Sequence, residues 1–209
     1  MSEIIETATL IHGDCMDYMR NLPDGAFELA IVDPPYRDEN QPTKDMRANG
    51  SMKPLTGRPP LEYFKELRRV SKDQIIWGAN NFQLPQFKGF VVWRKLTISQ
   101  DFTMSMAEIA SLSEGLSTVS KIFDHAPQGT TKDPRIHPTQ KPVRLYEWLL
   151  LNYAKPGDKI LDTHLGSGSS AIAAIRHGFE FVGIELDADY YSGAVDRVRQ
   201  STAQAAFDL

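Results

Sequence analysis

The sequence predicts an α/β fold in which a mostly parallel sheet carries helices on both faces. Short runs rich in β-branched residues alternate with helical patterns along the chain, and several of these runs are apolar throughout, as strands buried on both faces are. No internal repeat and no low-complexity tract interrupts this alternation. The length of 209 residues suits one compact domain with a sizeable core and is short for two. We therefore expect a single domain over residues 1–209.

The elements can be located from their patterns. Strands are expected at 9–12, 28–32, 74–77, 90–93, 108–112, 159–161 and 180–184. Helices are expected at about 14–22, 60–71, 143–154, 169–177 and 188–201. Two helix ends carry typical signals, since Pro142 suits the first turn of one helix and Gly178 can close another.

Two irregular segments interrupt the pattern. Residues 37–59 hold several Pro and Gly residues among polar ones and almost nothing apolar to bury, which predicts a long mobile loop. Residues 124–142 are also rich in Pro. The strand–helix pattern resumes after each segment, so neither is expected to link two domains.

Composition excludes several classes of protein. Apolar runs are only a few residues long, as at 148–151, so no segment is expected to span a membrane. The first nine residues carry two acids and no base, unlike a secretory signal. The single cysteine, Cys15, excludes an internal disulfide and a cysteine-rich zinc site, and the five histidines show no metal-ligand spacing. We expect a cytoplasmic protein, in a bacterial or phage-infected cell, without a metal.

The formal net charge of −4 is unevenly distributed. Residues 1–36 carry −6, residues 37–159 carry +6 and residues 160–209 carry −4. Such asymmetry is typical of a protein in which one face meets an anion, although a solvated surface with uneven charge would show the same distribution.

A glycine-containing turn follows the strand expected at 159–161. Asp162 stands at its head, Gly166 and Gly168 lie within it, and an Ala-rich helix follows. The glycines let the backbone approach a ligand, and the helix start offers free N–H groups. An acid heading the turn would repel a phosphate and suits a ligand with a cationic amine. Glu185, at the end of the next strand, is placed to hold ribose hydroxyls. A tight strand-to-helix turn without a ligand remains the alternative.

The strand at 28–32 runs directly into the tetrad Asp33-Pro34-Pro35-Tyr36. The two prolines end the strand and stiffen the turn. The Asp33 carboxylate and the Pro34 carbonyl could accept the two hydrogens of an aromatic amine, while the Tyr36 ring stacks on the base. Such acceptors make the delocalised lone pair of the amine available for reaction.

At these residues the chain resembles the β-class amino-group DNA methyltransferases, which act on adenine N6 or cytosine N4, and small phage-type members in particular. In that class the catalytic tetrad lies N-terminal to the cofactor turn. Four further segments follow the family's order, at His12–Cys15, Ile76–Phe82, Val91–Lys95 and His137–Pro142. The resemblance covers nearly the whole chain. It implies a Rossmann-like methyltransferase fold dependent on S-adenosylmethionine, with a seven-stranded, mostly parallel sheet and permuted motif order.

The resemblance also implies residue roles. The target adenine would be held, flipped out of the duplex, by Asp33, Pro34, Pro35 and Tyr36. The cofactor, S-adenosylmethionine, would be bound by Asp14, Thr139, Gln140, Lys141, Pro142, Asp162, Gly166, Ser167, Gly168 and Glu185. The family often has Pro and Phe where this chain has Thr163 and His164, and we interpret His164 as a polar filler of the Phe site.

Double-stranded DNA is the expected partner, and a homodimer is the expected assembly. Phosphate contacts are expected from Arg37, Lys44, Arg47, Lys53, Arg58, Lys132 and Arg135. Residues at about 115–136 are expected to form a short region for target recognition. Cys15 is interpreted as a small buried residue rather than a nucleophile.

Four acceptors or roles stay open at this point. The leading expectation is the adenine amine, and the first alternative is the cytosine amine, which relatives usually pair with Ser in place of Asp33. An RNA or protein amine is a second alternative. A non-catalytic nucleic-acid-binding module that keeps the fold is the third, although the intact Asp33, Gly166 and Gly168 argue against it.

Overall fold

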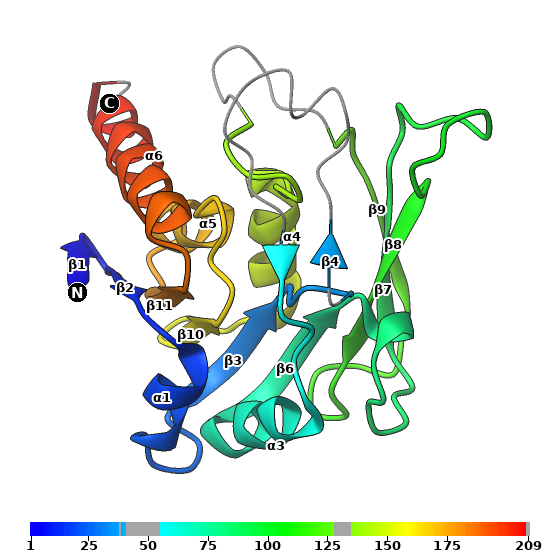
Figure 1. Cartoon of the computed structure of the whole chain (residues 1–209), viewed down its shortest axis with the longest axis horizontal. Helices are drawn as coiled ribbons and strands as arrows, with labels where there is room; N and C mark the ends of the chain where they lie inside the picture. Colours follow the sequence, from blue (N-terminus) through cyan, green and yellow to red (C-terminus); the bar gives the residue numbers. More distant parts are fainter. Residues whose placement is uncertain (38, 41–54, 128–134, 208–209) are drawn as a thin grey trace.

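The computed structural model describes residues 1–37, 39–40, 55–127 and 135–207. Nine strands form one sheet in the order β1-β2-β11-β10-β3-β6-β8-β7-β9 (Figure 1). Their bounds are β1 Ser2–Ile5, β2 Ala8–His12, β3 Phe27–Val32, β6 Ser71–Trp77, β7 Phe90–Arg94, β8 Ala107–Leu112, β9 Lys121–Asp124, β10 Lys159–Asp162 and β11 Glu180–Glu185. The short strands β4 (Glu39–Asn40) and β5 (Leu55–Thr56) pair with each other apart from this sheet.

Most strands of the large sheet share one direction. The neighbours β2, β11, β10, β3 and β6 run parallel. β8 lies antiparallel between β6 and β7, β9 runs parallel to β7, and β1 is antiparallel to β2. It follows that β1 and β8 oppose the other strands of the sheet.

The seven expected strands are confirmed, but the prediction of a seven-stranded, mostly parallel sheet is wrong in strand number, because the sheet is mixed and has nine strands. The short strands β4 and β5 fall within the segment predicted as a loop, 37–59, and were not predicted. The two strands of the large sheet that were missed, β1 and β9, lie at its opposite edges. Their residues are largely exposed or half-buried, so neither carries the continuous apolar run of a strand buried on both faces. Because β9 falls within residues 115–136, part of the expected recognition region belongs to the sheet.

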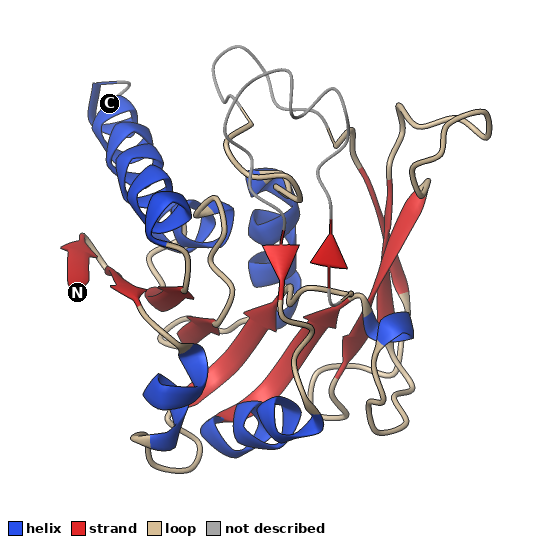
Figure 2. Ribbon diagram, in the orientation of Figure 1, coloured by secondary structure: helices blue, strands red, loops and turns tan. Residues whose placement is uncertain are grey.

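Five helices stand where the sequence predicts them (Figure 2). They are α1 (Cys15–Arg20), α3 (Leu61–Val70), α4 (Val143–Tyr153), α5 (Ser169–Arg176) and α6 (Ala188–Phe207). A short 3-10 turn, η1, spans Ala79–Asn81. Gly178 follows α5 with a φ of 71°, the left-handed conformation that commonly ends a helix. No helix in the described part of the chain is long and apolar enough to cross a membrane.

The helices divide between two apolar cores, one on each face of the sheet. In the larger core, residues of α4, α5 and α6 pack against strand residues that include Trp77 and Trp93, which are almost fully buried. In the smaller core, Phe64 and Leu67 of α3 pack against Val32 and Ile76. This two-sided covering is the α/β layering that the sequence predicts.

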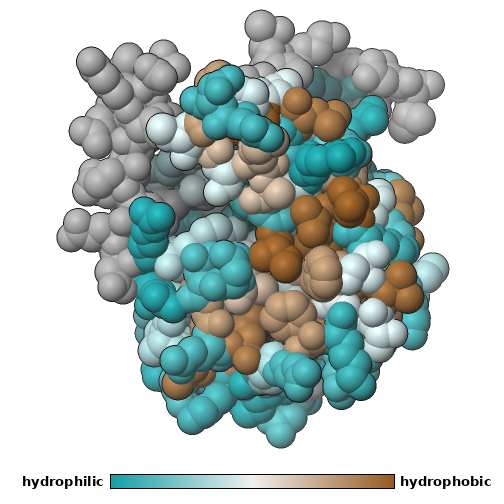
Figure 3. Space-filling model, turned by 90° about the vertical axis from the view of Figure 1, so that its right-hand side faces the viewer, coloured by the Kyte–Doolittle hydropathy of each residue, from teal (hydrophilic) through white to brown (hydrophobic). Residues whose placement is uncertain are grey.

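The sheet ends in an exposed edge at β9. Figure 3 views the molecule from this side and shows apolar side chains gathered near the middle of the face. Val119, Ile122 and Leu151 are each more than 60% exposed. An edge strand presents unpaired main-chain groups, so this end of the sheet is suited to pairing with another chain.

Candidate active site

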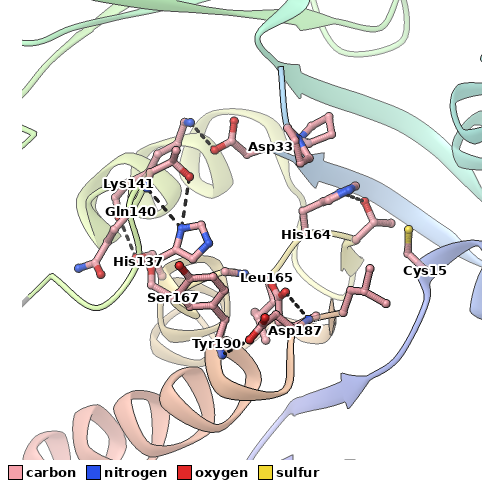
Figure 4. Close-up of a pocket in the computed structure, with 18 of the residues that line it drawn as sticks. Cys15, Asp33, His137, Gln140, Lys141, His164, Leu165, Ser167, Asp187 and Tyr190 are labelled. Carbon is pink, nitrogen blue, oxygen red and sulfur yellow. Dashed lines mark hydrogen bonds and ion pairs between the residues drawn. The ribbon is translucent and has the colours of Figure 1, made fainter. Parts of the chain in front are cut away.

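A cavity of about 390 Å³ opens beside the carboxyl ends of β3, β10 and β11. Ligands of open α/β sheets bind at this edge, because the turns after parallel strands meet there. Figure 4 shows side chains converging on the cavity from segments far apart in the sequence. The walls are formed by Gly13–Cys15, Asp33–Tyr36, Gly57, Glu108, His137, Thr139–Lys141, Tyr146, Thr163–Ser167, Ser169, Glu185–Asp187 and Tyr190.

The tetrad after β3 forms one side of the cavity. The Asp33 side chain is only 12% exposed, and both of its oxygens accept hydrogen bonds. The Tyr36 hydroxyl donates to Oδ1 at 2.7 Å. Lys141 Nζ donates to Oδ2 at 2.5 Å (Figure 4). Lys141, expected among the cofactor residues, therefore contacts the carboxylate expected to hold the target amine.

A second carboxylate, Glu108 of β8, faces the first across Lys141. Lys141 Nζ lies 2.9 Å from Glu108 Oε2, and Lys95 Nζ lies 2.6 Å from Glu108 Oε1. The Tyr36 hydroxyl is 3.2 Å from Oε2. The sequence reasoning missed Glu108 and Lys95 as site residues. The sequence held one signal for Glu108, which stands near the start of an apolar strand. An acid buried there requires a charged or hydrogen-bonding partner.

Burial and charge shift the pKa values of this group. Burial raises the pKa of Asp33, and Glu108 raises it further, against the opposing effect of Lys141. Burial also acts to raise the pKa of Glu108, but Lys141 and Lys95 hold it at about 2. Burial acts to lower the pKa of Lys141, and its two carboxylate neighbours raise it overall. Glu108 is therefore a fixed anion and Lys141 a fixed cation at neutral pH.

The Tyr36 ring packs against Gly78. Gly78 has a φ of 69°, and a Cβ atom at this position would overlap the Tyr36 ring. Phe82 meets the same ring edge-on, with ring centroids 6.1 Å apart. Gly78 thus provides the space in which the ring sits beside Asp33.

The glycine turn after β10 forms the opposite side of the cavity. Gly166 and Gly168 have φ values of 54° and 76°. Glu185 Oε2 accepts a hydrogen bond from the Gly166 N–H at 2.8 Å, and Oε1 accepts one from the Asp187 N–H at 2.9 Å. The Glu185 carboxylate is thereby fixed at the cavity wall, with lone pairs left for hydroxyl donors.

Asp162 lies behind this turn and is not part of the cavity wall. It is 1% exposed and accepts hydrogen bonds from the Ser170 hydroxyl at 2.6 Å and the His164 N–H at 3.0 Å. Burial raises the pKa of Asp162 to about 7. In this structure its contacts hold the turn and the start of α5 together.

The segment before α4 closes the cavity from a third side. His137 packs edge-on against Tyr190 with centroids 4.4 Å apart, and burial lowers its pKa to about 3, so its ring is neutral. The Ser169 hydroxyl donates to the Lys141 carbonyl at 2.8 Å. This bond ties the segment to the glycine turn.

The remaining cofactor residues divide by position. Thr139, Gln140 and Ser167 line the cavity, whereas Pro142 and Gly168 do not. Asp14 also lines it and caps α1 by accepting a hydrogen bond from the Met16 N–H at 2.7 Å.

Cys15 and His164 lie together on one side of the cavity (Figure 4). Burial raises the pKa of Cys15 to about 12, so it is a neutral thiol at physiological pH. Burial lowers the pKa of His164 to about 4, and its ring packs edge-on against Tyr63 at 5.4 Å. His164 thus packs against an aromatic ring, as a filler of a Phe site would, and it also lines the cavity.

The basic residues expected to contact DNA are only partly described. Arg37 and Arg58 are exposed, and the Arg58 guanidinium lies over the Phe82 ring. Arg135 is half-buried and donates hydrogen bonds to the carbonyls of His137 and Pro138. The other four, Lys44, Arg47, Lys53 and Lys132, lie outside the described residues, as does most of the loop expected at 37–59. Within the described ranges, no group of three or more His, Cys, Asp and Glu residues could hold a metal ion.

Comparison with known proteins defines the family. Residues 92–196, just over half of the chain, match the family of N6/N4 methyltransferases described as DNA methylase. Two Escherichia coli K12 proteins are similar along most of their length. The chain is 26% identical to YubD, which carries the name of a methylase, over 90% of this chain and 88% of YubD. It is 22% identical to the DNA adenine methyltransferase YhdJ, over 98% and 87%.

Solved structures show the same fold. The M1.HpyAVI complex with S-adenosylmethionine superposes with a TM-score of 0.60 at 20% identity, over 91% of this chain and 99% of that one. The cytosine-N4-specific PvuII DNA methyltransferase has a TM-score of 0.65 at 11% identity, over 94% and 90%. TTHA0409 from Thermus thermophilus, complexed with S-adenosylmethionine, has a TM-score of 0.59 at 17% identity, over 92% and 93%.

The fold and the cavity are those of a methyltransferase dependent on S-adenosylmethionine. The chain belongs to the N6/N4 DNA methyltransferase family, and S-adenosylmethionine is its cofactor. The cavity fits that group in volume and chemistry, since about 390 Å³ lies in the range of small-molecule sites. A fixed carboxylate, Glu185, is available for ribose hydroxyls, and Gly166 leaves its wall free of a side chain.

Proposed function

We propose that this protein methylates the exocyclic N6 amino group of adenine in double-stranded DNA. The observation that carries the proposal is the Asp33 carboxylate, held with Tyr36 at the end of β3 on the same cavity as Glu185 and the glycine turn. This arrangement brings a hydrogen-bond acceptor for an amine next to a nucleoside-sized site. The name of YhdJ as an adenine methyltransferase supports the choice of base.

In the proposed mechanism, Asp33 and the Pro34 carbonyl accept hydrogen bonds from the amine, and the Tyr36 ring stacks on the base. These contacts are formed before reaction, so they stabilise charge that develops on the amine nitrogen without reorganisation. S-adenosylmethionine supplies an electrophilic methyl group. The amine must lose one proton as it gains that group, and the Asp33 oxygens are placed to accept it.

The Asp33 side chain is only 12% exposed, so a base within a duplex cannot reach it. We therefore propose that the target nucleotide is flipped out of the stack before reaction, as in other enzymes that modify a base.

The second candidate is the amino group of cytosine N4. The similarity in fold to the cytosine-N4-specific PvuII enzyme favours it. Asp33 argues for adenine, because relatives that act on cytosine usually carry Ser at this position.

Identification of the product tests the proposal. DNA is incubated with radiolabelled S-adenosylmethionine, digested to nucleosides and separated by chromatography. We expect label in N6-methyl-2′-deoxyadenosine, since the tetrad presents Asp33 to the amine. Label confined to N4-methyl-2′-deoxycytidine would contradict the choice of base. Transfer to RNA or protein alone, or no transfer to any acceptor, would contradict DNA methylation itself.

We also propose that the basic residues of segment 37–59 bind DNA phosphates. Replacing Lys44, Arg47, Lys53 and Arg58 together with Ala is expected to weaken DNA binding and flatten its dependence on salt. Each lost phosphate contact lowers the logarithmic salt slope by about 0.9. Fluorescence anisotropy with labelled duplex DNA over a series of salt concentrations measures this slope.

Cofactor affinity in the same variant serves as the control and should change little. An unaltered salt slope would indicate that other basic residues bind the DNA phosphates. The candidates are then Lys121, Lys132 and Arg135. The recognised DNA sequence is expected to be short and degenerate. Reading base edges requires several well-placed side chains, and the segments 37–59 and 115–136 offer few such side chains.

We propose a homodimer as the assembly. The support is the family resemblance and the exposed β9 edge with Val119 and Ile122, which a second copy could cover. Light scattering at micromolar concentration is expected to give about twice the chain mass of 23.5 kDa. A single species at the chain mass would contradict the dimer.

A further inference from the structure

Four charged side chains form a cluster beneath the proposed base site. Lys141 lies between Asp33 and Glu108, and Lys95 lies on the far side of Glu108. The side chains of Lys141, Asp33, Glu108 and Lys95 are 3%, 12%, 19% and 8% exposed, so all four are largely removed from water. Burying charges is costly unless they are paired, and here two acids balance two bases. The mechanism above uses only Asp33 of these four.

Tyr36 connects the two carboxylates. Its hydroxyl has one proton and two acceptors, Asp33 Oδ1 at 2.7 Å and Glu108 Oε2 at 3.2 Å. The hydroxyl can donate to only one of them at a time. While it donates to Asp33, it competes with the amine for that carboxylate oxygen. Donation to Glu108 would leave Asp33 Oδ1 to the amine.

Lys141 competes with the amine in the same way, for the other oxygen of Asp33. Its ammonium draws electron density from Asp33 Oδ2 and so weakens the carboxylate as an acceptor. The same ammonium also lies 2.9 Å from Glu108 Oε2, so its charge is divided between two carboxylates and it draws less electron density from Asp33. Lys95 holds Glu108 ionised through Oε1 and leaves Oε2 for Lys141 and Tyr36.

We propose that Glu108 is a positioning residue for the methyl transfer, which keeps the Asp33 carboxylate available to the amine by accepting hydrogen bonds from Tyr36 and Lys141. This inference rests on the proposed function of Asp33. Glu108 acts on the amine through Asp33 and contacts neither the base nor the cofactor in this role.

Asp33 has several titratable neighbours besides Glu108. Lys141 and Tyr36 contact it directly, while Asp162 of β10, Tyr63 of α3 and Tyr146 of α4 interact with it electrostatically. Burial raises the pKa of Asp33, and Glu108 adds to that rise. Loss of the Glu108 charge should therefore lower the pKa of Asp33, whereas a change in packing alone would have no such specific effect.

The variant Glu108→Gln tests the proposal with two independent readouts. We expect the single-turnover rate of methyl transfer to fall roughly ten- to a hundredfold, the range for losing a hydrogen bond to a charged group. Cofactor affinity should change less than about twofold, because Glu108 does not contact the cofactor in this role. The pKa of Asp33, followed by carbon NMR of labelled carboxyl groups in the free protein, should fall. The acid limb of the rate profile should move to lower pH with it, because a more acidic solution is then needed to protonate Asp33.

Glu180→Gln is the matched control. It makes the same exchange of side chain at the start of β11, outside the cavity wall, where Glu180 pairs with Lys159 at 2.6 Å in a largely exposed ion pair. Its rate and its Asp33 pKa should equal those of the wild type, which separates the role of Glu108 from a change in net charge.

Glu108→Gln leaves two buried lysines with one carboxylate and could impair folding. The double variant Glu108→Gln/Lys95→Met restores the charge balance and serves as the second test, with folding checked by circular dichroism. We expect the same fall in rate and in the pKa of Asp33 as in the single variant.

A double-mutant cycle with Tyr36→Phe tests the route through the hydroxyl. The effect of Glu108→Gln on the rate should be smaller in the Phe background, because no hydroxyl then competes for Asp33 Oδ1. Equal effects in both backgrounds would overturn the proposal, as would an unchanged pKa of Asp33. Absence of methyl transfer by the wild type would instead overturn the proposed function, while the NMR titration would still decide the role of Glu108.

Discussion

Asp33→Ala is expected to lower the rate of methyl transfer by several orders of magnitude while cofactor affinity stays nearly unchanged. The carboxylate would stabilise charge on the amine mainly in the transition state, so its loss should appear in turnover rather than in cofactor binding. Single-turnover rates and the dissociation constant of S-adenosylmethionine, measured on the same preparation, check both parts. Turnover equal to that of the wild type would contradict the chemistry assigned to Asp33.

Asp33→Asn is the matched control for this variant, because the amide keeps the size of the side chain and loses the charge. Removing the Asp33 charge leaves Lys141 with Glu108 as its counter-ion, so folding should be checked by thermal unfolding. We expect the Asn variant to retain wild-type cofactor affinity and to be nearly as slow as the Ala variant.

The rate should depend on pH in a defined direction. Asp33 must be ionised to accept hydrogen bonds from the amine, and burial raises its pKa above the usual value. Activity should therefore be lost as the pH falls through this raised pKa, at a higher pH than for an exposed aspartate.

Glu185→Ala is expected to have the second largest effect, on cofactor binding rather than on turnover with bound cofactor. The carboxylate is fixed by the N–H groups of Gly166 and Asp187 and lines the cavity. We propose that this carboxylate binds the ribose hydroxyls of the cofactor. Loss of such bonds should raise the dissociation constant of S-adenosylmethionine roughly ten- to a hundredfold, the range for hydrogen bonds to a charged group. Isothermal titration calorimetry measures this change.

Glu185→Gln distinguishes a loss of bonds to the cofactor from a distortion of the glycine turn. Its amide oxygen can still accept one hydrogen bond from the backbone, so the glycine turn is better preserved than in the Ala variant. An unchanged cofactor affinity in both variants, with folding intact, would show that Glu185 does not hold the ribose.

The pattern of apolar residues along the chain was sufficient to predict most of the strands and helices. The parallel strands at the centre of the sheet are apolar along their length because both faces are buried, and this signal is present in the sequence itself. The edge strands β1 and β9 carry no such signal, because half of each faces water. Whether such a segment pairs with the sheet depends on what lies beside it.

The site divides in the same way. The tetrad at Asp33, the glycine turn at Gly166 and the acid at Glu185 are local motifs, and the structure brings all three to one cavity. Asp162 has the expected place in the sequence, but its carboxylate turns inward to Ser170 and away from the cavity. A motif specifies the position of the backbone more closely than the direction of each side chain.

The sequence by itself determined the α/β alternation, the family resemblance and the residues heading each functional turn, because these depend on neighbours along the chain. Only the tertiary structure decided that Lys141 contacts Asp33 and that Glu108 and Lys95 complete the charge cluster. These contacts join the ends of β3 and β7, strand β8 and the segment before α4, which come from separate parts of the chain. Their geometry depends on how the sheet is assembled, and a buried charge finds its partner only when the strands and helices have packed together.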